Sequence, residues 1–232
     1  DSCLITDERD LVPSHADTFV SYRRMPLEVV LPETTAQVAA VLKACHALDV
    51  PVVARGAGTG LSGGAMPHAR GVVLSLAKFN RILRVDPRSR TATVQAGVRN
   101  LAISEAAAPH GLYYAPDPSS QIACTIGGNV AENSGGVHCL KYGLTTNNVL
   151  GVELVTMAGE ILRIGGRTLD APGYDLLGVV NGSEGMLGVI TEVTVRILPR
   201  PATARAALLG FPSIEAAGQC VADIIAEGII PA

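Results

Sequence analysis

The stretch Arg55-Gly56-Ala57-Gly58-Thr59-Gly60-Leu61-Ser62-Gly63-Gly64 follows a short apolar run at 51–54, and its closely spaced glycines guide the interpretation of the whole chain. Glycine lets successive backbone N–H groups converge on an anion without interference from a Cβ atom. The hydroxyl groups of Thr59 and Ser62 add two further donors. The sequence therefore predicts a loop that cradles a diphosphate. A mobile surface loop is the alternative.

Two familiar phosphate-binding patterns do not fit this stretch. Gly58 to Gly63 matches G-x-G-x-x-G, but a Rossmann site needs glycines that open a helix and an acidic residue about 20 positions later. Here the glycines run into Ala65-Met66-Pro67, a strand is expected next, and Leu83 stands near the position of the acid. A Walker loop is excluded because the chain has no Gly-Lys-Ser or Gly-Lys-Thr.

Composition excludes several classes of function. The chain has 232 residues, 48% of them hydrophobic, and a formal net charge of -3, without the basic stripe of a nucleic-acid-binding protein. Its longest apolar runs are strand-sized, so no membrane span is predicted, and no signal peptide opens the chain. Five cysteines without a Cys-x-x-Cys pair indicate reduced thiols, a cytoplasmic location and no metal site.

The order of elements predicts an α+β fold of two subdomains. Residues 26–80 are expected to form a small β-α-β unit. In it, strands at 28–31, 51–54 and 71–76 accompany a helix whose capping box is Thr34 and Gln37 and whose apolar positions run from Val38 to Leu48.

Residues 81–200 are expected to form a mixed, mostly antiparallel sheet with helices. Its predicted elements are a hairpin of 81–86 with 91–95, a helix at 100–108, a long functional loop at 115–143, a hairpin of 149–156 with 161–164, and a strand at 190–198.

The two ends of the chain are expected to lie outside these subdomains. Residues 1–25 are predicted to be an N-terminal arm, extended or with a short helix. Residues 201–232 are predicted to begin a further domain, a substrate or cap domain, with a strand at 206–211 and a helix capped by Ser213. Because the chain starts at Asp1 and stops as another element begins, we expect it to be a fragment of a longer polypeptide.

A second cluster of small residues lies in the predicted long loop. Pro116-Asp117-Pro118-Ser119-Ser120 is followed by Cys124-Thr125-Ile126-Gly127-Gly128-Asn129 and Asn133-Ser134-Gly135-Gly136. Backbone amides and neutral side-chain donors with little charge suit a flat ring with polar edges, such as a flavin. Two ordinary turns are the alternative, but they leave the helical spacing of Asn129 and Asn133 unexplained.

These segments together resemble the FAD-linked oxidases of the vanillyl-alcohol oxidase type, which carry a PCMH-type FAD-binding domain. The resemblance covers about residues 22–231 and is greatest to FAD-linked subunits of bacterial glycolate oxidases, then to D-lactate dehydrogenases. The motifs that carry it, in order, lie at 51–65, 116–120, 126–133, 136–143 and 182–191.

The resemblance implies which residues hold FAD. The diphosphate would rest on the loop from Arg55 to Gly63, and Glu184 with Gly185 would hold the ribityl or adenosine end. Thr59 stands where some relatives carry a His that is linked to the flavin, so non-covalent FAD is expected. The implied cofactor residues are Arg55, Gly56, Ala57, Gly58, Thr59, Gly60, Leu61, Ser62, Gly63, Pro116, Ser119, Ser120, Thr125, Gly127, Gly128, Asn129, Ala131, Asn133, Gly135, Glu184, Gly185, Val189 and Ile190.

The resemblance also implies an activity, namely hydride transfer from C2 of a 2-hydroxy acid (glycolate or D-lactate) to flavin N5. The electrons would then pass to partners, an iron–sulfur subunit and a second flavin-fold subunit, which could hold the protein at the inner membrane. The catalytic residues would lie beyond Ala232, so this fragment would be inactive alone, and His138 is the one catalytic candidate within it. A flavin oxidase of a sugar or aromatic alcohol and a non-catalytic, flavin-free subunit are the alternatives.

Overall fold

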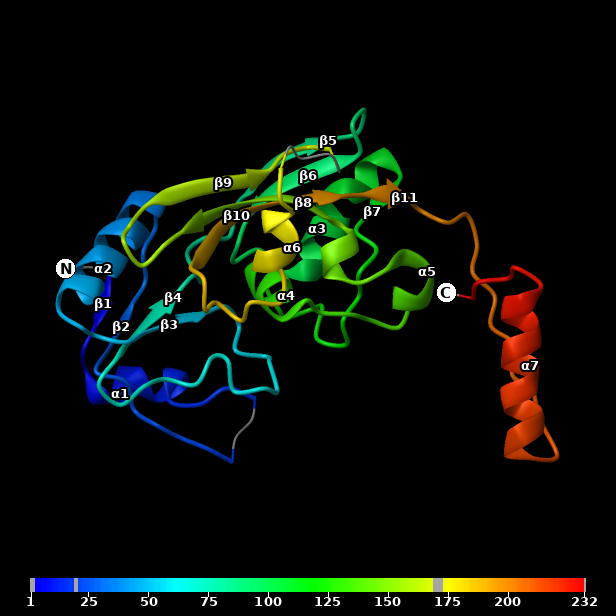
Figure 1. The fold of residues 1–232 in the computed structure, drawn as a ribbon, viewed down its shortest axis with the longest axis horizontal. Coiled ribbons are helices and arrows are strands. Elements are labelled where there is room, and N and C mark those ends of the chain that lie inside the picture. Colours follow the sequence, from blue (N-terminus) through cyan, green and yellow to red (C-terminus); the bar gives the residue numbers. More distant parts are fainter. Residues whose placement is uncertain (1–2, 19–20, 169–172, 232) are drawn as a thin grey trace.

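Two β-sheets, one mostly parallel and one antiparallel, carry the fold (Figure 1). The structure, a computed structural model, describes residues 3–18, 21–168 and 173–231. The prediction of an α+β fold with two subdomains is confirmed: a small unit with a parallel core of strands is followed by a larger antiparallel sheet with helices.

The first sheet has the order β1-β2-β4-β3. The strands are β1 (Leu4–Ile5), β2 (Glu28–Val30), β4 (Val72–Ser75) and β3 (Val52–Arg55). β4 pairs in parallel with both β2 and β3, as the β-α-β prediction requires, whereas β1 pairs with β2 in the antiparallel sense. The N-terminal segment, in which α1 (Glu8–Leu11) and a 3-10 helix (Val12–Ser14) follow, therefore contributes a strand to this unit.

Helix α2 (Thr35–Ala47) connects β2 to β3, and it begins with the predicted capping box. The N–H of Gln37 donates to Oγ1 of Thr34, and the side chain of Gln37 accepts from the N–H of Thr34. Val38, Leu42 and Cys45 are buried on one face of the helix, while Leu48, at its C-cap, is exposed.

The second sheet has the order β5-β6-β10-β8-β9, and every neighbouring pair is antiparallel. Its strands are β5 (Ile82–Asp86), β6 (Thr91–Gln95), β8 (Val149–Val155), β9 (Ile161–Gly165) and β10 (Val189–Arg196). Both predicted hairpins, β5–β6 and β8–β9, are confirmed. β10 lies between them and joins them into one sheet.

Short helices cover this sheet and line its edges. They are α3 (Asn100–Ala107), α4 (Ile126–Glu132), α5 (Cys139–Tyr142) and α6 (Leu176–Val180), with 3-10 turns at Ala108–His110 and Thr145–Asn147. A separate pair of strands joins β7 (Leu112–Tyr113) to β11 (Leu198–Pro199). The prediction of a continuous loop at 115–143 is wrong, because α4 and α5 lie within it. The helical spacing of Asn129 and Asn133 is accounted for by α4, and Gly127 lets this helix pack closely on a strand, as described below.

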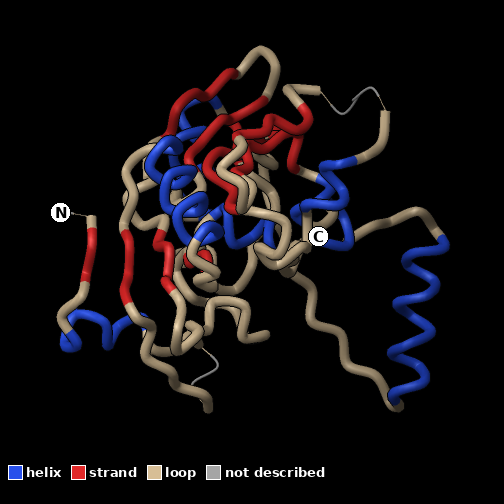
Figure 2. Tube along the Cα trace, turned by 60° about the vertical axis from the view of Figure 1, so that its left-hand side comes forward, coloured by secondary structure: helices blue, strands red, loops and turns tan. Residues whose placement is uncertain are grey.

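The C-terminal segment stands apart from the rest of the described chain (Figures 1 and 2). Helix α7 (Ile214–Ala226) begins where predicted, with the N–H of Ala216 donating to Oγ of Ser213. The predicted strand at 206–211 is wrong. These residues are exposed and no described strand lies beside them, so their backbone groups lack the partner that a strand requires.

One apolar core joins the two sheets. It includes Leu42 of α2, Leu74 of β4, Ile103 of α3, Val130 of α4 and Val193 of β10.

A buried carboxylate reinforces the junction. Oε1 of Glu153, on β8, accepts from the hydroxyls of Thr35 of α2, at 2.8 Å, and Thr191 of β10, at 2.9 Å. The first unit is thus fixed against the second, which fixes the shape of the space between them.

Candidate cofactor-binding site

A cavity of about 470 Å³ lies between the two sheets, within the size range of small-molecule sites. Ala54 and Arg55, at the end of β3, lie on its wall with Leu76, which follows β4. Ala96, after β6, and Val189, which begins β10, line it from the second sheet. The Gly-rich loop and α4 complete the enclosure, so both subdomains contribute to one site.

The Gly-rich loop is held in shape by side chains at its base. Nη1 of Arg55 donates to the carbonyl oxygen of Ala65 at 3.3 Å, closing the loop. The Thr18 hydroxyl and N–H donate to the carbonyl oxygen of Gly58 at 2.9 and 3.0 Å. Gly58 has a φ of +69°, and an added Cβ would lie 2.4 Å from Nη2 of Arg55, so this position requires glycine. Burial lowers the pKa of Arg55, and the charge of Asp17 opposes that shift.

The shape of this loop leaves backbone donors available. Among the described residues, no backbone N–H from Gly56 to Ser62 donates to another group of the chain. Most of this segment lines the cavity. A run of unused N–H groups around a concave surface is the arrangement that binds phosphate oxygens. The loop therefore fits a diphosphate.

Helix α4 forms the opposite side of the cavity and is anchored to the second sheet. The N–H groups of Ile126 and Gly127 donate to the carbonyl oxygens of Val98 and Ala96 at 2.9 and 2.8 Å. A Cβ added at Gly127 would lie 2.8 Å from Cβ of Ala96, so the helix approaches the strand as closely as a glycine allows.

The two glycine clusters meet directly across the cavity. A Cβ added at Gly56, in the first cluster, would lie 2.2 Å from Oγ1 of Thr125, in the second. Both of these residues line the cavity. The two motifs singled out in the sequence therefore belong to one site.

The turn before β10 closes a third side. The N–H of Gly182 donates to the carbonyl oxygen of Val130, and that of Glu184 to the carbonyl oxygen of Ala131, both at 2.9 Å. These bonds tie the turn to α4 and bring Glu184 and Gly185 to the cavity.

One acidic side chain lies against the Gly-rich loop. A Cβ added at Gly60 or Gly64 would lie 3.3 or 3.2 Å from Oε1 of Glu132. Burial, together with the charges of Glu184 and Asp17, raises the pKa of Glu132. The surroundings therefore disfavour a negative charge on this carboxyl group, beside a loop suited to an anion.

The structure brings together all but three of the predicted cofactor residues. Ser62, Gly63 and Pro116 do not line the cavity. The carbonyl oxygen of Gly63 accepts from the N–H of Met66 in a turn, and that of Pro116 accepts from the side chain of Asn100.

Sequence reasoning missed several lining residues. Most of them lie inside the motifs given above and could have been included: Ala54, Gly64, Ala65, Pro118, Cys124, Glu132, Ser134 and Gly188. Leu76 and Ala96 lie outside these motifs and reach the cavity through the pairing of the strands that they follow.

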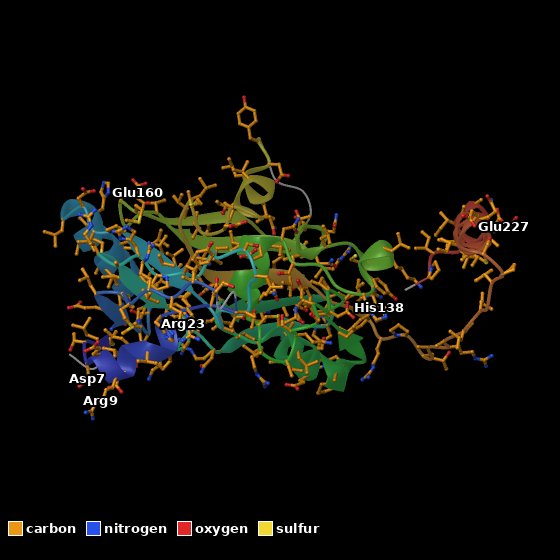
Figure 3. All side chains as sticks on the ribbon, turned by 90° about the horizontal axis from the view of Figure 1, so that it is seen from below. Asp7, Arg9, Arg23, His138, Glu160 and Glu227 are labelled. Atoms are coloured by element: carbon orange, nitrogen blue, oxygen red, sulfur yellow. The ribbon has the colours of Figure 1, made fainter. Side chains whose placement is uncertain are left out.

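His138 lies away from the cavity lining, toward the α5 end of the domain (Figure 3). Its Nδ1 is 2.5 Å from Oδ2 of Asp117, and its N–H donates to Oδ1 of the same residue at 3.3 Å. These contacts give His138 a role in holding the start of α5. In the described part of the chain, no three His, Cys, Asp or Glu side chains gather into a possible metal site.

The fold and the cavity define an FAD-binding domain. The family model described as FAD binding domain matches residues 26–165, so the chain belongs to this family and FAD is its cofactor. The resemblance inferred from the motifs is confirmed.

Among curated proteins, glycolate oxidase subunit GlcD of Escherichia coli (strain K12) is 62% identical over 98% of this chain and 46% of its own length. D-lactate dehydrogenase of Archaeoglobus fulgidus is 41% identical over 92% of this chain and 46% of its length. The chain thus spans about half the length of the curated relatives it matches.

Among solved structures, alkyldihydroxyacetonephosphate synthase superposes with a TM-score of 0.78 at 24% identity, covering 87% of this chain and 39% of that one. This likeness shows the fold alone. Within the described residues, no helix is both long and apolar enough to cross a bilayer.

Proposed function

We propose that FAD occupies the cavity between the two sheets, with its diphosphate on the loop from Arg55 to Gly63 and its ring system beside the segments 116–120 and 125–135. Glu184, Gly185 and the backbone at Val189 and Ile190 would hold the ribityl or adenosine end. The observation that carries this proposal is the run of unused N–H groups from Gly56 to Leu61, a segment that lines the same cavity as α4. Backbone amides with few charged neighbours suit both the diphosphate and the polar edge of the ring.

We further propose that the protein is the FAD-binding portion of a dehydrogenase of 2-hydroxy acids. The chemistry that bound FAD supplies is acceptance, at flavin N5, of the hydride from C2 of glycolate or D-lactate. The similarity to a glycolate oxidase subunit and to D-lactate dehydrogenases supports this substrate class. Substrate-binding and catalytic residues would lie in the part of such proteins that this chain does not cover.

The chain's own residues would bind and orient the cofactor. The Gly-rich loop would hold the diphosphate through its amides, while α4 and the turn at Glu184 would fix the two ends of the molecule. We propose that the attachment is non-covalent, because Thr59 has no nucleophilic ring nitrogen with which to form a link to the flavin. Acid precipitation of the holoprotein should therefore release all of its flavin into the supernatant. Flavin retained by the pellet would contradict this.

We propose that electrons leave the flavin through partner subunits. The E. coli relative is itself named a subunit of glycolate oxidase, which supports such an assembly. An iron–sulfur subunit and a second flavin-fold subunit are the partners we infer, in the cytoplasm or at the inner membrane through those partners. Co-purification of the tagged protein with an iron–sulfur absorbance would support this, and a flavin-only preparation that reduces no acceptor would contradict it.

Two measurements test the proposed activity in turn. The purified protein is first titrated with FAD. A lack of flavin absorbance after saturation would point instead to a flavin-free subunit. The protein, with any region beyond this chain included, is then assayed with glycolate and D-lactate and a dye acceptor. Reduction of the dye by either acid supports the proposal, whereas reduction only by a sugar or aromatic alcohol would favour a flavin oxidase of the same fold.

A further inference from the structure

A buried side chain behind the cavity connects two of its walls. Asn100, the first residue of α3, is only 2% exposed and does not line the cavity. Its Nδ2 donates to the carbonyl oxygen of Pro116 at 3.2 Å and to Oδ1 of Asn129 at 3.0 Å. Its backbone N–H donates to the carbonyl oxygen of Cys124 at 2.9 Å. One residue thus holds the segment that begins at Pro116 and helix α4 at a fixed separation.

The same contact fixes the direction of a cavity-lining amide. Asn129 is 3% exposed and lines the cavity. Because its Oδ1 accepts from Asn100, its Nδ2 is turned toward Sγ of Cys124, at 3.3 Å, and Oγ of Ser134, at 3.4 Å. The oxygen and nitrogen of a carboxamide are similar in shape, so its partners decide which way it points. Cys124 and Ser134 also line the cavity.

We propose that Asn100 is a positioning residue of the FAD site and acts through Asn129 without touching the cofactor. With Asn100 as its donor, Asn129 presents N–H groups toward Cys124 and Ser134. Without Asn100, the carboxamide can turn over and present its oxygen there, and the pattern of donors and acceptors at the wall reverses. This inference rests on the proposed placement of FAD in the cavity.

A purely space-filling role does not account for Asn100. An apolar side chain of similar volume would fill the same space, but it would leave the carbonyl oxygen of Pro116 without a donor. It would also leave Oδ1 of Asn129 with only the weak thiol donor of Cys124, at 3.7 Å, and both losses are costly in a buried setting. Both contacts of its Nδ2 lead to segments that contribute to the cavity. The hydrogen bonds of Asn100 therefore fix the geometry of that wall.

A matched control exists in Asn148, which is fully buried. Its Nδ2 donates to the carbonyl oxygens of Tyr142 and Leu144 at 3.0 and 2.8 Å, and its Oδ1 accepts from Arg196 at 3.0 Å. None of these four residues lines the cavity. Asn148→Ala therefore removes three buried side-chain hydrogen bonds, one more than Asn100→Ala, without altering the wall.

The test is a double-mutant cycle on the purified protein. Wild type, Asn100→Ala, Asn129→Ala and the double variant are stripped of flavin and titrated with FAD, and the visible spectrum and midpoint potential are recorded at saturation. Asn100→Ala should weaken FAD binding by about tenfold and shift the flavin bands, while in the Asn129→Ala background its further effect should be small. Asn148→Ala should leave the dissociation constant for FAD within about twofold of wild type and the flavin bands in place, although it destabilises the fold.

Three outcomes would overturn the proposal: unchanged FAD binding by Asn100→Ala, an equal effect in both backgrounds, or an equal loss in Asn148→Ala. If Asn100→Ala does not fold, Asn100→Asp replaces it, because aspartate has the shape of asparagine but lacks the N–H donors. FAD binding is then compared in the same two backgrounds, with Asn129 and with Ala at that position.

Gly128→Leu separates this proposal from the placement of FAD, because a Cβ at Gly128 meets only Oγ1 of Thr125, at 3.5 Å, and a longer side chain would extend into the cavity. If Gly128→Leu weakens binding and Asn100→Ala does not, only the role of Asn100 fails. If neither does, the placement of FAD fails as well.

Discussion

Two adjacent glycines of α4 should respond to alanine in opposite directions. A Cβ at Gly127 would lie 2.8 Å from Cβ and 3.1 Å from the carbonyl oxygen of Ala96, whereas a Cβ at Gly128 would meet only Oγ1 of Thr125, at 3.5 Å. Carbon atoms in contact prefer about 3.5–4.0 Å, so Gly127→Ala must move the helix away from the strand by roughly 1 Å. That movement also stretches the hydrogen bond from Gly127 to Ala96.

The magnitudes follow from this geometry. Overpacking lowers the free energy of unfolding by about 1–3 kcal/mol, and the higher helix propensity of alanine relative to glycine offsets up to about 1 kcal/mol of that loss. Gly127→Ala should therefore lower the free energy of unfolding by about 2 kcal/mol, because the stretched hydrogen bond adds to the steric cost. Gly128→Ala should leave that free energy unchanged or raise it by up to about 1 kcal/mol.

The assay is urea unfolding of the flavin-free protein followed by far-UV circular dichroism, because the chain has no tryptophan. A loss of about 2 kcal/mol corresponds to a fall of roughly 4–8 °C in melting temperature for a chain of this size. FAD titration provides a second readout, in which Gly128→Ala should bind less tightly because its methyl group enters the cavity. If Gly127→Ala is as stable as Gly128→Ala, the close approach of α4 to Ala96 is refuted.

Glu153→Ala should lower the free energy of unfolding by about 3 kcal/mol, since the hydroxyls of Thr35 and Thr191 lose their acceptor, while Glu153→Gln should cost only about 1 kcal/mol; equal losses in urea unfolding would contradict this. The pKa of Glu132 is raised in the folded state, so its contribution to stability is present at low pH and is lost as the pH rises through that pKa. Glu132→Gln should remove this part of the pH dependence, and identical profiles for variant and wild type would refute it. Ser213→Ala should reduce the helicity of α7, at a cost of about 1 kcal/mol, without moving the main unfolding midpoint, because no residue of α7 is buried; a shifted midpoint would show that α7 packs on the domain.

Local signals allowed much of the fold to be predicted from the sequence. The hairpin β5–β6 has a turn of Pro87-Arg88-Ser89-Arg90 between two alternating strands, and the capping box of Thr34 and Gln37 marks the start of α2. Each of these features depends on residues close together in the chain. Most of the candidate site could be predicted for the same reason, because a glycine-rich motif is recognised from consecutive residues.

The errors have nonlocal causes. The segment 115–143 is predicted to be a loop, yet Gly127 and Gly128 within it belong to a helix whose approach to Ala96 is visible only in three dimensions. The segment 206–211 has the composition of a strand, but no described strand lies beside it. Asn100 carries no motif, and its importance follows from contacts with residues 16 and 29 positions later.

Because the cavity has walls from both sheets, the stability of the protein against unfolding and degradation should depend on its cofactor. A ligand in the cavity contacts both units, so its binding raises the free energy that is needed to unfold either of them. At about one hundred times the dissociation constant, that addition is about 2.7 kcal/mol. In a cell short of flavin, the apoprotein would open more often and be the form that proteases remove. The abundance of this protein, and not only its activity, should therefore follow the supply of flavin.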